Sequence, residues 1–96
     1  MATGPASLDF DFPLSGKTAV GCNVADPTSV ETAIQAVIAK FGRIDILVNS
    51  AGIVDLAPAE TISLKAWQRT LDVNLTGSFL MAQAVGRQMI AQSGGK

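Results

Sequence analysis

A repeating pattern of apolar residues in the first half of the chain predicts an amphipathic helix. The apolar positions recur at intervals of three and four residues, which places them on one helix face: Val30, Ala33, Ile34, Val37, Ile38 and Phe41. Asp26 and Pro27 are typical of a helix start, because Asp caps free N–H groups and Pro has a helical φ. Gly42 is typical of a helix end. We therefore expect a helix that begins at Pro27 and ends before Gly42.

Two short apolar runs flank this helix and predict β-strands. They cover residues 18–24 and 44–49, lengths that suit strands buried on both faces of a parallel sheet. Together with the helix they predict a β–α–β unit with a right-handed crossover. The second run ends in the small residues Asn49–Gly52, which let a ligand approach the carboxyl end of a strand. The pattern therefore predicts an α/β fold with a binding edge at this point.

A broader apolar pattern predicts a second, longer helix over residues 64–92. Ser63 is a suitable N-cap for it. Its apolar stripe is wider than one contact surface needs, so we expect the helix to be buried or shared with a partner. Asn74, Thr76 and Gly77 interrupt the pattern midway and predict a kink there.

Composition narrows the class of protein. The 96 residues are 48% hydrophobic and 16% charged, with a mean hydropathy of +0.35, which is typical of globular proteins. The net charge is −1 and the charges are dispersed, so the sequence has no basic patch of the kind that binds nucleic acid or an anionic membrane. The chain has no histidine, which excludes histidine-based triads and most metal sites. We expect no metal, no nucleic acid and no membrane partner.

Further features concern location and the N-terminus. No apolar run reaches the ~20 residues of a membrane-spanning helix, and the first residues carry no signal-peptide pattern. The single cysteine, Cys22, fits a reducing compartment, so we expect a cytoplasmic protein. Residues 1–15 contain two prolines and an alternation of Asp and Phe. They predict an extended leader or, alternatively, a frayed terminus, and residues 16–96 are the predicted folded domain.

Four motifs resemble, in order, those of the short-chain dehydrogenase/reductase family. Asn49-Ser50-Ala51-Gly52 resembles the Asn-x-Ala-Gly motif that ends the family's fourth strand. Leu14–Val20 looks like the first strand with its lead-in, and Gly21–Pro27 like the end of the third strand. Leu71–Gly77 is similar to the helix segment that carries the family's catalytic asparagine. Four motifs in the expected order are a specific signal, and the resemblance covers nearly all of residues 14–96.

The resemblance implies a fold and a reaction. The fold would be a partial Rossmann-type, doubly wound parallel sheet, made of the β–α–β unit and the one long helix. The cofactor would be NAD or NADP, and the reaction a hydride transfer between the nicotinamide and an alcohol or ketone. The sequence Gly77–Arg87 looks closest to members that oxidise sugar alcohols and small diols, so the implied substrate is a polyol.

The resemblance also assigns a catalytic role to one residue of the long helix. Asn74 corresponds to the family's catalytic asparagine, which holds a water in a proton relay. The alternative is an asparagine in the helix interior that only satisfies backbone groups at a kink.

The cofactor-binding residues implied by the resemblance lie at two strand ends. Asn49 would anchor one end, where Ala51 and Gly52 would let the adenosine side of the dinucleotide approach the main chain. The alternative is a tight turn from strand to loop, which needs the same small residues. Asn23 and Val24 stand where most members have Asp-Val next to the adenine. An Asn side-chain carbonyl can accept a hydrogen bond from the adenine amino group.

Several family elements are missing from the sequence. Val20 runs directly into sequence like that of the third strand, so the glycine-rich turn that holds dinucleotide phosphates is absent. The catalytic serine and the Tyr-x-x-x-Lys pair are also absent, and the chain contains no tyrosine. We therefore expect an internally deleted, truncated portion of a dehydrogenase that is inactive by itself. In this portion, residues 17–24 would form one strand that joins sequence like the family's first strand to sequence like its third. This strand would pair in parallel with residues 44–49.

Two other hypotheses stay open. The chain is a candidate for a non-catalytic interaction module that forms homo-oligomers through the helix at 64–92, because an apolar helix face can associate with a copy of itself. The other possibility is a truncated gene product without a role.

Overall fold

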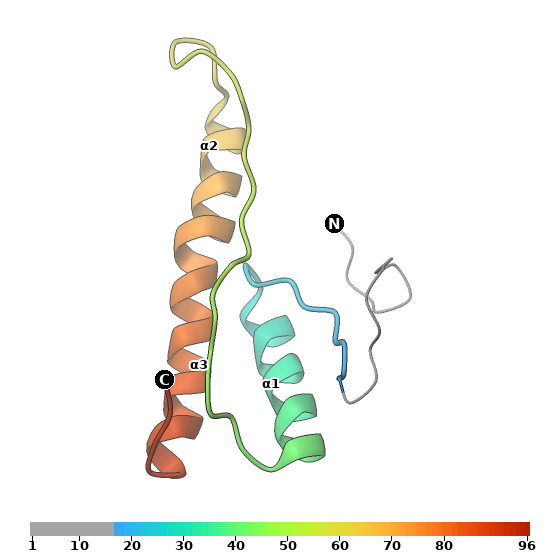
Figure 1. The fold of residues 1–96 in the computed structure, drawn as a ribbon. Helices are drawn as coiled ribbons and strands as arrows, with labels where there is room; N and C mark the ends of the chain where they lie inside the picture. Colours follow the sequence, from blue (N-terminus) through green and yellow to red (C-terminus); the bar gives the residue numbers. More distant parts are fainter. Residues whose placement is uncertain (1–16) are drawn as a thin grey trace.

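The regular elements in the described part of the protein are helices. The computed structural model describes residues 17–96, so the expected leader at 1–15 lies outside the described residues. Four helical elements follow one another in this part: α1 (Pro27–Phe41), α2 (Leu64–Leu71), η2 (Asp72–Thr76) and α3 (Gly77–Ala91). α2, η2 and α3 continue one another as one long rod, and α1 lies beside the α3 half of it (Figure 1).

Helix α1 has the ends that its capping residues predict. The Asp26 side chain accepts a hydrogen bond from the Thr28 N–H at 3.0 Å, and Pro27 occupies the first turn. Gly42 has a φ of 79°, and its N–H donates to the carbonyl of Ile38 at 2.8 Å. The left-handed φ favours glycine, because a Cβ is strained there. The predicted helix is confirmed at both ends.

The long rod begins at the predicted cap and contains a π-helical turn at the predicted interruption. The Ser63 hydroxyl accepts from the Ala66 N–H at 3.0 Å and so caps α2. The interruption is η2, a five-residue π-helix, after which the N–H of Gly77 donates to the carbonyl of Asp72. A π turn accommodates one extra residue per turn without ending the helix. At this point the helix therefore continues, with more residues per turn.

A small apolar core joins α1 to α3. Its buried members come from both helices: Val30, Ile34, Ala84 and Val85. The extended segment that follows α1 adds partly buried Ile44 and Leu47 to the same cluster. This packing places the segment along α3, where the predicted binding edge lies.

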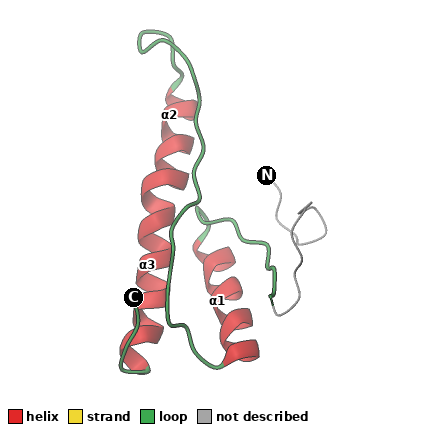
Figure 2. Ribbon diagram, viewed as in Figure 1, coloured by secondary structure: helices red, strands yellow, loops and turns green. Residues whose placement is uncertain are grey.

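The predicted strands at 18–24 and 44–49 do not form in the described part of the chain, where both segments are loop (Figure 2). No backbone hydrogen bond joins the two segments within residues 17–96, so the expected parallel pairing is wrong. A strand buried on both faces needs packing layers on each side of it. Here Ile46 and Val48 are 67% and 77% exposed, because the segment has helices against only part of its surface. The expected partial sheet is absent from the described residues.

Within residues 17–96, no helix has both the length and the apolar character needed to cross a bilayer.

Candidate functional site

Asn74 lies in η2 and binds the backbone of Ile53 with its side chain. Its Oδ1 accepts from the Ile53 N–H at 2.8 Å, and its Nδ2 donates to the Ile53 carbonyl at 2.8 Å. π turns are frequent at functional sites, and this one carries a carboxamide that pairs with an extended backbone. Asn74 therefore satisfies backbone groups of a segment distant in sequence, and a catalytic role for it stays a prediction.

The small residues of the predicted binding edge lie next to Asn74. A Cβ placed on Gly52 would lie 3.4 Å from the Asn74 Oδ1, an ordinary van der Waals distance, so Gly52 lies directly beside the Asn74 side chain. Asn49 is attached one helical turn further along, because its Nδ2 donates to the carbonyl of Ser78 at 3.3 Å. Ala51 and Gly52 are exposed. The structure thus brings Asn49, Gly52 and Asn74 together along η2 and the start of α3. Ala51 lies between Asn49 and Gly52 in the sequence.

Asn23 forms a tight turn in front of α1. Its Oδ1 accepts from the Ala25 N–H at 3.1 Å, and its carbonyl accepts from the Asp26 N–H at 3.0 Å. Its own N–H donates to the Ser29 hydroxyl at 2.7 Å. The side-chain oxygen expected to face adenine is therefore already engaged, although a carbonyl oxygen has a second lone pair.

Val24 packs against the long rod. A Cβ placed on Gly77 would come within 2.7 Å of the Val24 Cγ2, which is closer than real contacts of this kind. Gly77 therefore allows the turn at residues 23–24 to lie directly on the rod, three residues after Asn74. All the predicted site residues except Ala51 contact or line the region around η2.

A cavity of about 400 Å³ adjoins this region. Its lining combines the turn before α1 with polar residues of α2 and with η2: Asn23, Ala25, Lys65, Gln68, Arg69, Asp72 and Val73. The Gln68 Nε2 donates to the Asp72 carboxylate at 2.9 Å, and Arg69 lies 3.6 Å from Asp55 in an ion pair whose carboxylate is half-buried. The α2 residues were not predicted as site residues. Their spacing of three and four residues marks a polar helix face, which could have indicated them.

The chemical groups at this site suit binding more than acid–base chemistry. They are carboxamides, main-chain groups and small residues, with two cations and one carboxylate at the cavity. Such groups hold a polar ligand through hydrogen bonds and close backbone approach. Within residues 17–96, no cluster of three or more His, Cys, Asp or Glu side chains could hold a metal ion.

Comparison with known proteins identifies the family. The model of the short chain dehydrogenase family matches residues 15–96. The chain belongs to this family, as the four motifs predicted.

Its relatives include several sugar-alcohol dehydrogenases. D-threitol dehydrogenase of Mycolicibacterium smegmatis is 61% identical over 74 residues, which are 77% of this chain and 28% of the relative. NAD-dependent glycerol dehydrogenase of Listeria innocua is 41% identical over 78 residues, or 81% of this chain and 31% of the relative. Galactitol 2-dehydrogenase of Agrobacterium fabrum is 43% identical over 79 residues, again 81% and 31%. The chain thus spans less than a third of the length of these relatives.

Solved structures show the same likeness in three dimensions. A variant of a Serratia marcescens short-chain dehydrogenase/reductase superposes with a TM-score of 0.72 at 33% identity, covering 76% of this chain and 30% of the other. ElxO with NADP bound superposes with a TM-score of 0.77 at 24% identity, covering 84% and 33%. These neighbours support an α/β fold for the family to which the chain belongs, whereas the described residues themselves carry no sheet.

Proposed function

We propose that the chain is a portion of an NAD(P)-dependent oxidoreductase that transfers hydride between the nicotinamide and a polyol or the corresponding ketone. The observation that carries the proposal is the 61% identity with D-threitol dehydrogenase over 74 residues. Glycerol and galactitol dehydrogenases among the relatives support the same substrate class. The single cysteine, Cys22, is free, in keeping with the cytoplasmic setting that we propose.

We propose that the adenosine side of the cofactor lies along the extended segment and the turn before α1. Ala51 and Gly52 are exposed there, and the turn at Asn23 and Val24 adjoins the cavity beside η2. Small residues and free main-chain groups are what a nucleotide needs for close approach. Among the similar proteins, one is named NAD-dependent and another holds NADP, so we propose a dinucleotide without choosing between the two.

We propose further that the 96-residue chain has no dehydrogenase activity by itself. It contains no tyrosine and no glycine-rich turn after Val20, so it cannot supply the proton donor or the phosphate site that the family resemblance implies. Asn74, the proposed catalytic residue, would act only beside those groups.

A segment exchange tests the proposal. The part of D-threitol dehydrogenase that aligns with this chain is replaced by the residues of this chain, and D-threitol oxidation is assayed with NAD and with NADP. We expect kcat/KM within about tenfold of the relative's own value, a change of about 1.4 kcal/mol in transition-state stabilisation. The isolated 96-residue chain should give no turnover in the same assay.

The control for this exchange changes Asn74 within the hybrid enzyme. Asn74→Ala should lower kcat by about 100-fold or more, in the range of lost proton-transfer catalysis. A folded hybrid without activity on D-threitol, or turnover by the isolated chain, would contradict the proposal.

A second candidate function, an interaction module, is favoured by the exposed apolar surface of the rod. Five of its large apolar side chains are more than half exposed, at intervals that repeat on one helix face: Leu64, Trp67, Leu75, Phe79 and Ile90. Monomeric proteins rarely leave large apolar surfaces uncovered. We propose that this surface, the outer stripe, pairs with the outer stripe of a second copy, since a two-fold axis lets one patch cover itself.

Size-exclusion chromatography with light scattering tests the pairing. We expect the isolated chain to elute as a dimer and the Phe79→Glu variant as a monomer, because a carboxylate at this position would be buried unpaired in the interface. Ala36→Glu, on the exposed side of α1, is the matched control and should stay dimeric. A monomeric wild-type chain would remove the interaction module from consideration.

A further inference from the structure

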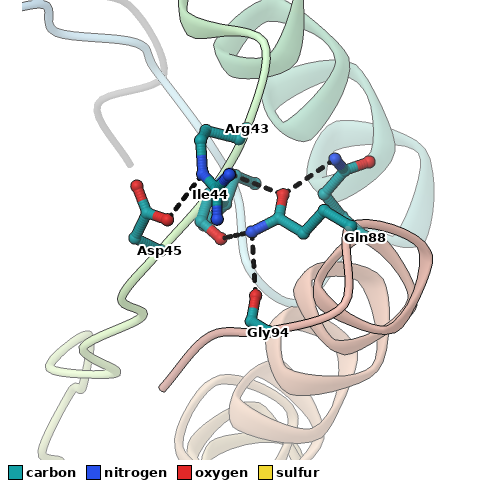
Figure 3. A network of polar contacts seen from close by, with 6 residues as sticks. Arg43, Ile44, Asp45, Gln88 and Gly94 are labelled. Atoms are coloured by element: carbon teal, nitrogen blue, oxygen red, sulfur yellow. Dashed lines mark hydrogen bonds and ion pairs between the residues drawn. The ribbon is translucent and has the colours of Figure 1, made fainter.

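The side chain of Gln92, directly after α3, makes four hydrogen bonds. Its Oε1 accepts from the Ile44 N–H at 3.1 Å and from the Gln88 Nε2 at 3.0 Å. Its Nε2 donates to the carbonyl of Ile44 and, at 2.9 Å, to that of Gly94. Figure 3 shows these contacts around Ile44, Gln88 and Gly94. A carboxamide offers two donors and two acceptor sites, and all are used here.

The orientation of the Gln92 amide follows from its partners. Both groups near the nitrogen are carbonyl oxygens, and both near the oxygen are N–H donors. A flipped amide would lose both bonds to Ile44 and the bond to Gly94, because main-chain groups cannot exchange donor and acceptor. The side chain therefore presents to Ile44 the same N–H and C=O pair that a neighbouring strand would present.

Two residues further along the segment, the main chain makes the pairing that Gln92 imitates. The N–H of Lys96 donates to the carbonyl of Asp45 at 2.8 Å, and the N–H of Leu47 donates to the main-chain oxygen of Lys96 at 2.7 Å. In parallel strands, one residue makes hydrogen bonds to the residues directly before and after the residue opposite it. Lys96 is thus paired in parallel with Ile46.

The end of α3 directs the chain back towards this segment. The N–H of Ser93 donates to the Ile90 carbonyl at 3.2 Å, and the N–H of Gly94 donates to the Met89 carbonyl at 2.9 Å. These two bonds form a Schellman motif, in which the residue after the cap is left-handed. Ser93 has this conformation, with a φ of 68°. Residues 94–96 leave the helix here and reach the 44–47 backbone within three residues.

We propose that the carboxamide of Gln92 fixes the register of the parallel pairing between residues 94–96 and residues 44–47. It bonds Ile44 on one side and Gly94 on the other, so it holds the two backbones at one relative position before Lys96 meets Ile46. A slip by one residue would break its bonds to Ile44 or to Gly94. The register also sets where the segment with Asn49 and Gly52 lies along α3. The inference does not rest on the proposed dehydrogenase function.

Amide hydrogen exchange, followed by NMR on the isolated chain, tests this role. Gln92→Met keeps the length and apolar stem of the side chain and removes its four hydrogen bonds. We expect exchange at the Leu47 and Lys96 N–H groups to become about tenfold faster or more, while the Gly42 N–H at the end of α1 changes less than about twofold. Gln35→Met is the matched control, since within residues 17–96 the Gln35 amide bonds to Glu31 alone, at 3.1 Å. Unchanged exchange at Leu47 and Lys96 in a folded Gln92→Met variant would overturn the proposal.

A measurement on the wild-type chain covers the case in which the variant does not fold. The side-chain amide protons of Gln92 should exchange several-fold more slowly than those of Gln35. Both Gln92 protons are bonded to main-chain carbonyls, and the bond to Ile44 is partly buried, whereas the single bond of Gln35 to Glu31 is exposed. They should also show through-space contacts to Ile44. Equal exchange rates for Gln92 and Gln35, or no contact to Ile44, would overturn the proposal as well.

Discussion

Ile34→Ala is expected to lower the free energy of unfolding by about 2–5 kcal/mol. Ile34 is 5% exposed and packs with Val30, Ala84 and Val85 between α1 and α3. The substitution removes buried methylene and methyl groups and leaves a cavity that a helix pair closes only in part. Because small domains have total stabilities of about 5–15 kcal/mol, this one change would remove a large share. Urea unfolding followed by circular dichroism measures it.

The matched control for Ile34→Ala is the same substitution on the outer stripe. Ile90 is 82% exposed, so Ile90→Ala in the monomeric Phe79→Glu background should change stability by less than about 0.5 kcal/mol. Equal losses of stability at the two positions would show that α1 and α3 do not share an apolar core around Ile34. The slope of free energy against urea should be the same in both variants, since the surface exposed on unfolding is nearly unchanged.

The helices could be predicted because their signals are local. Asp26 caps α1 through an N–H two residues away, and Ser63 caps α2 through one three residues away. Gly42 ends α1 because of its own backbone conformation. Each of these effects acts within one helical turn, so a sequence pattern contains the whole cause.

The strands could not be predicted from their own residues. Burial of an apolar run depends on what covers it, and the run at 44–49 has Ile46 and Val48 largely exposed in the described structure. Pairing depends on which backbone comes alongside. The expected partner at 17–24 makes no backbone hydrogen bond to this run, and Lys96 bonds to it instead. Both are properties of the tertiary arrangement, which β-propensity does not contain.

The candidate site was predictable where family motifs cover it and unpredictable elsewhere. Asn49, Gly52 and Asn74 belong to two of the family motifs, and the structure brings them together along η2. Gln92 belongs to no motif. As a polar residue at the end of a helix it gives no local signal, and its three partner residues are known only from the fold.

Gly77→Ala is expected to destabilise the chain, although the same change stabilises most helices. A Cβ at this position would lie 2.7 Å from the Val24 Cγ2, 3.1 Å from its Cβ and 3.3 Å from its carbonyl oxygen. Valine is stiff at χ1, so the turn before α1 must move away from the rod. Overpacking of this kind costs about 1–3 kcal/mol, against a gain of about 1 kcal/mol in helix propensity. We expect a net loss of up to about 2 kcal/mol in urea unfolding.

Two further variants separate the contact from the helix. Gly86→Ala is the control within α3, because a Cβ there meets no atom of the described residues within 4 Å, and it should stabilise the chain by up to about 1 kcal/mol. Val24→Ala removes the Cγ2 atom, which is the nearest that a Cβ on Gly77 would meet, so the double variant should recover about 1 kcal/mol or more relative to the sum of the single changes. If Gly77→Ala stabilises as Gly86→Ala does, Val24 does not lie on the rod. The turn that carries Asn23 would then lie elsewhere than beside η2, and the cavity between them would not be the site of a nucleotide.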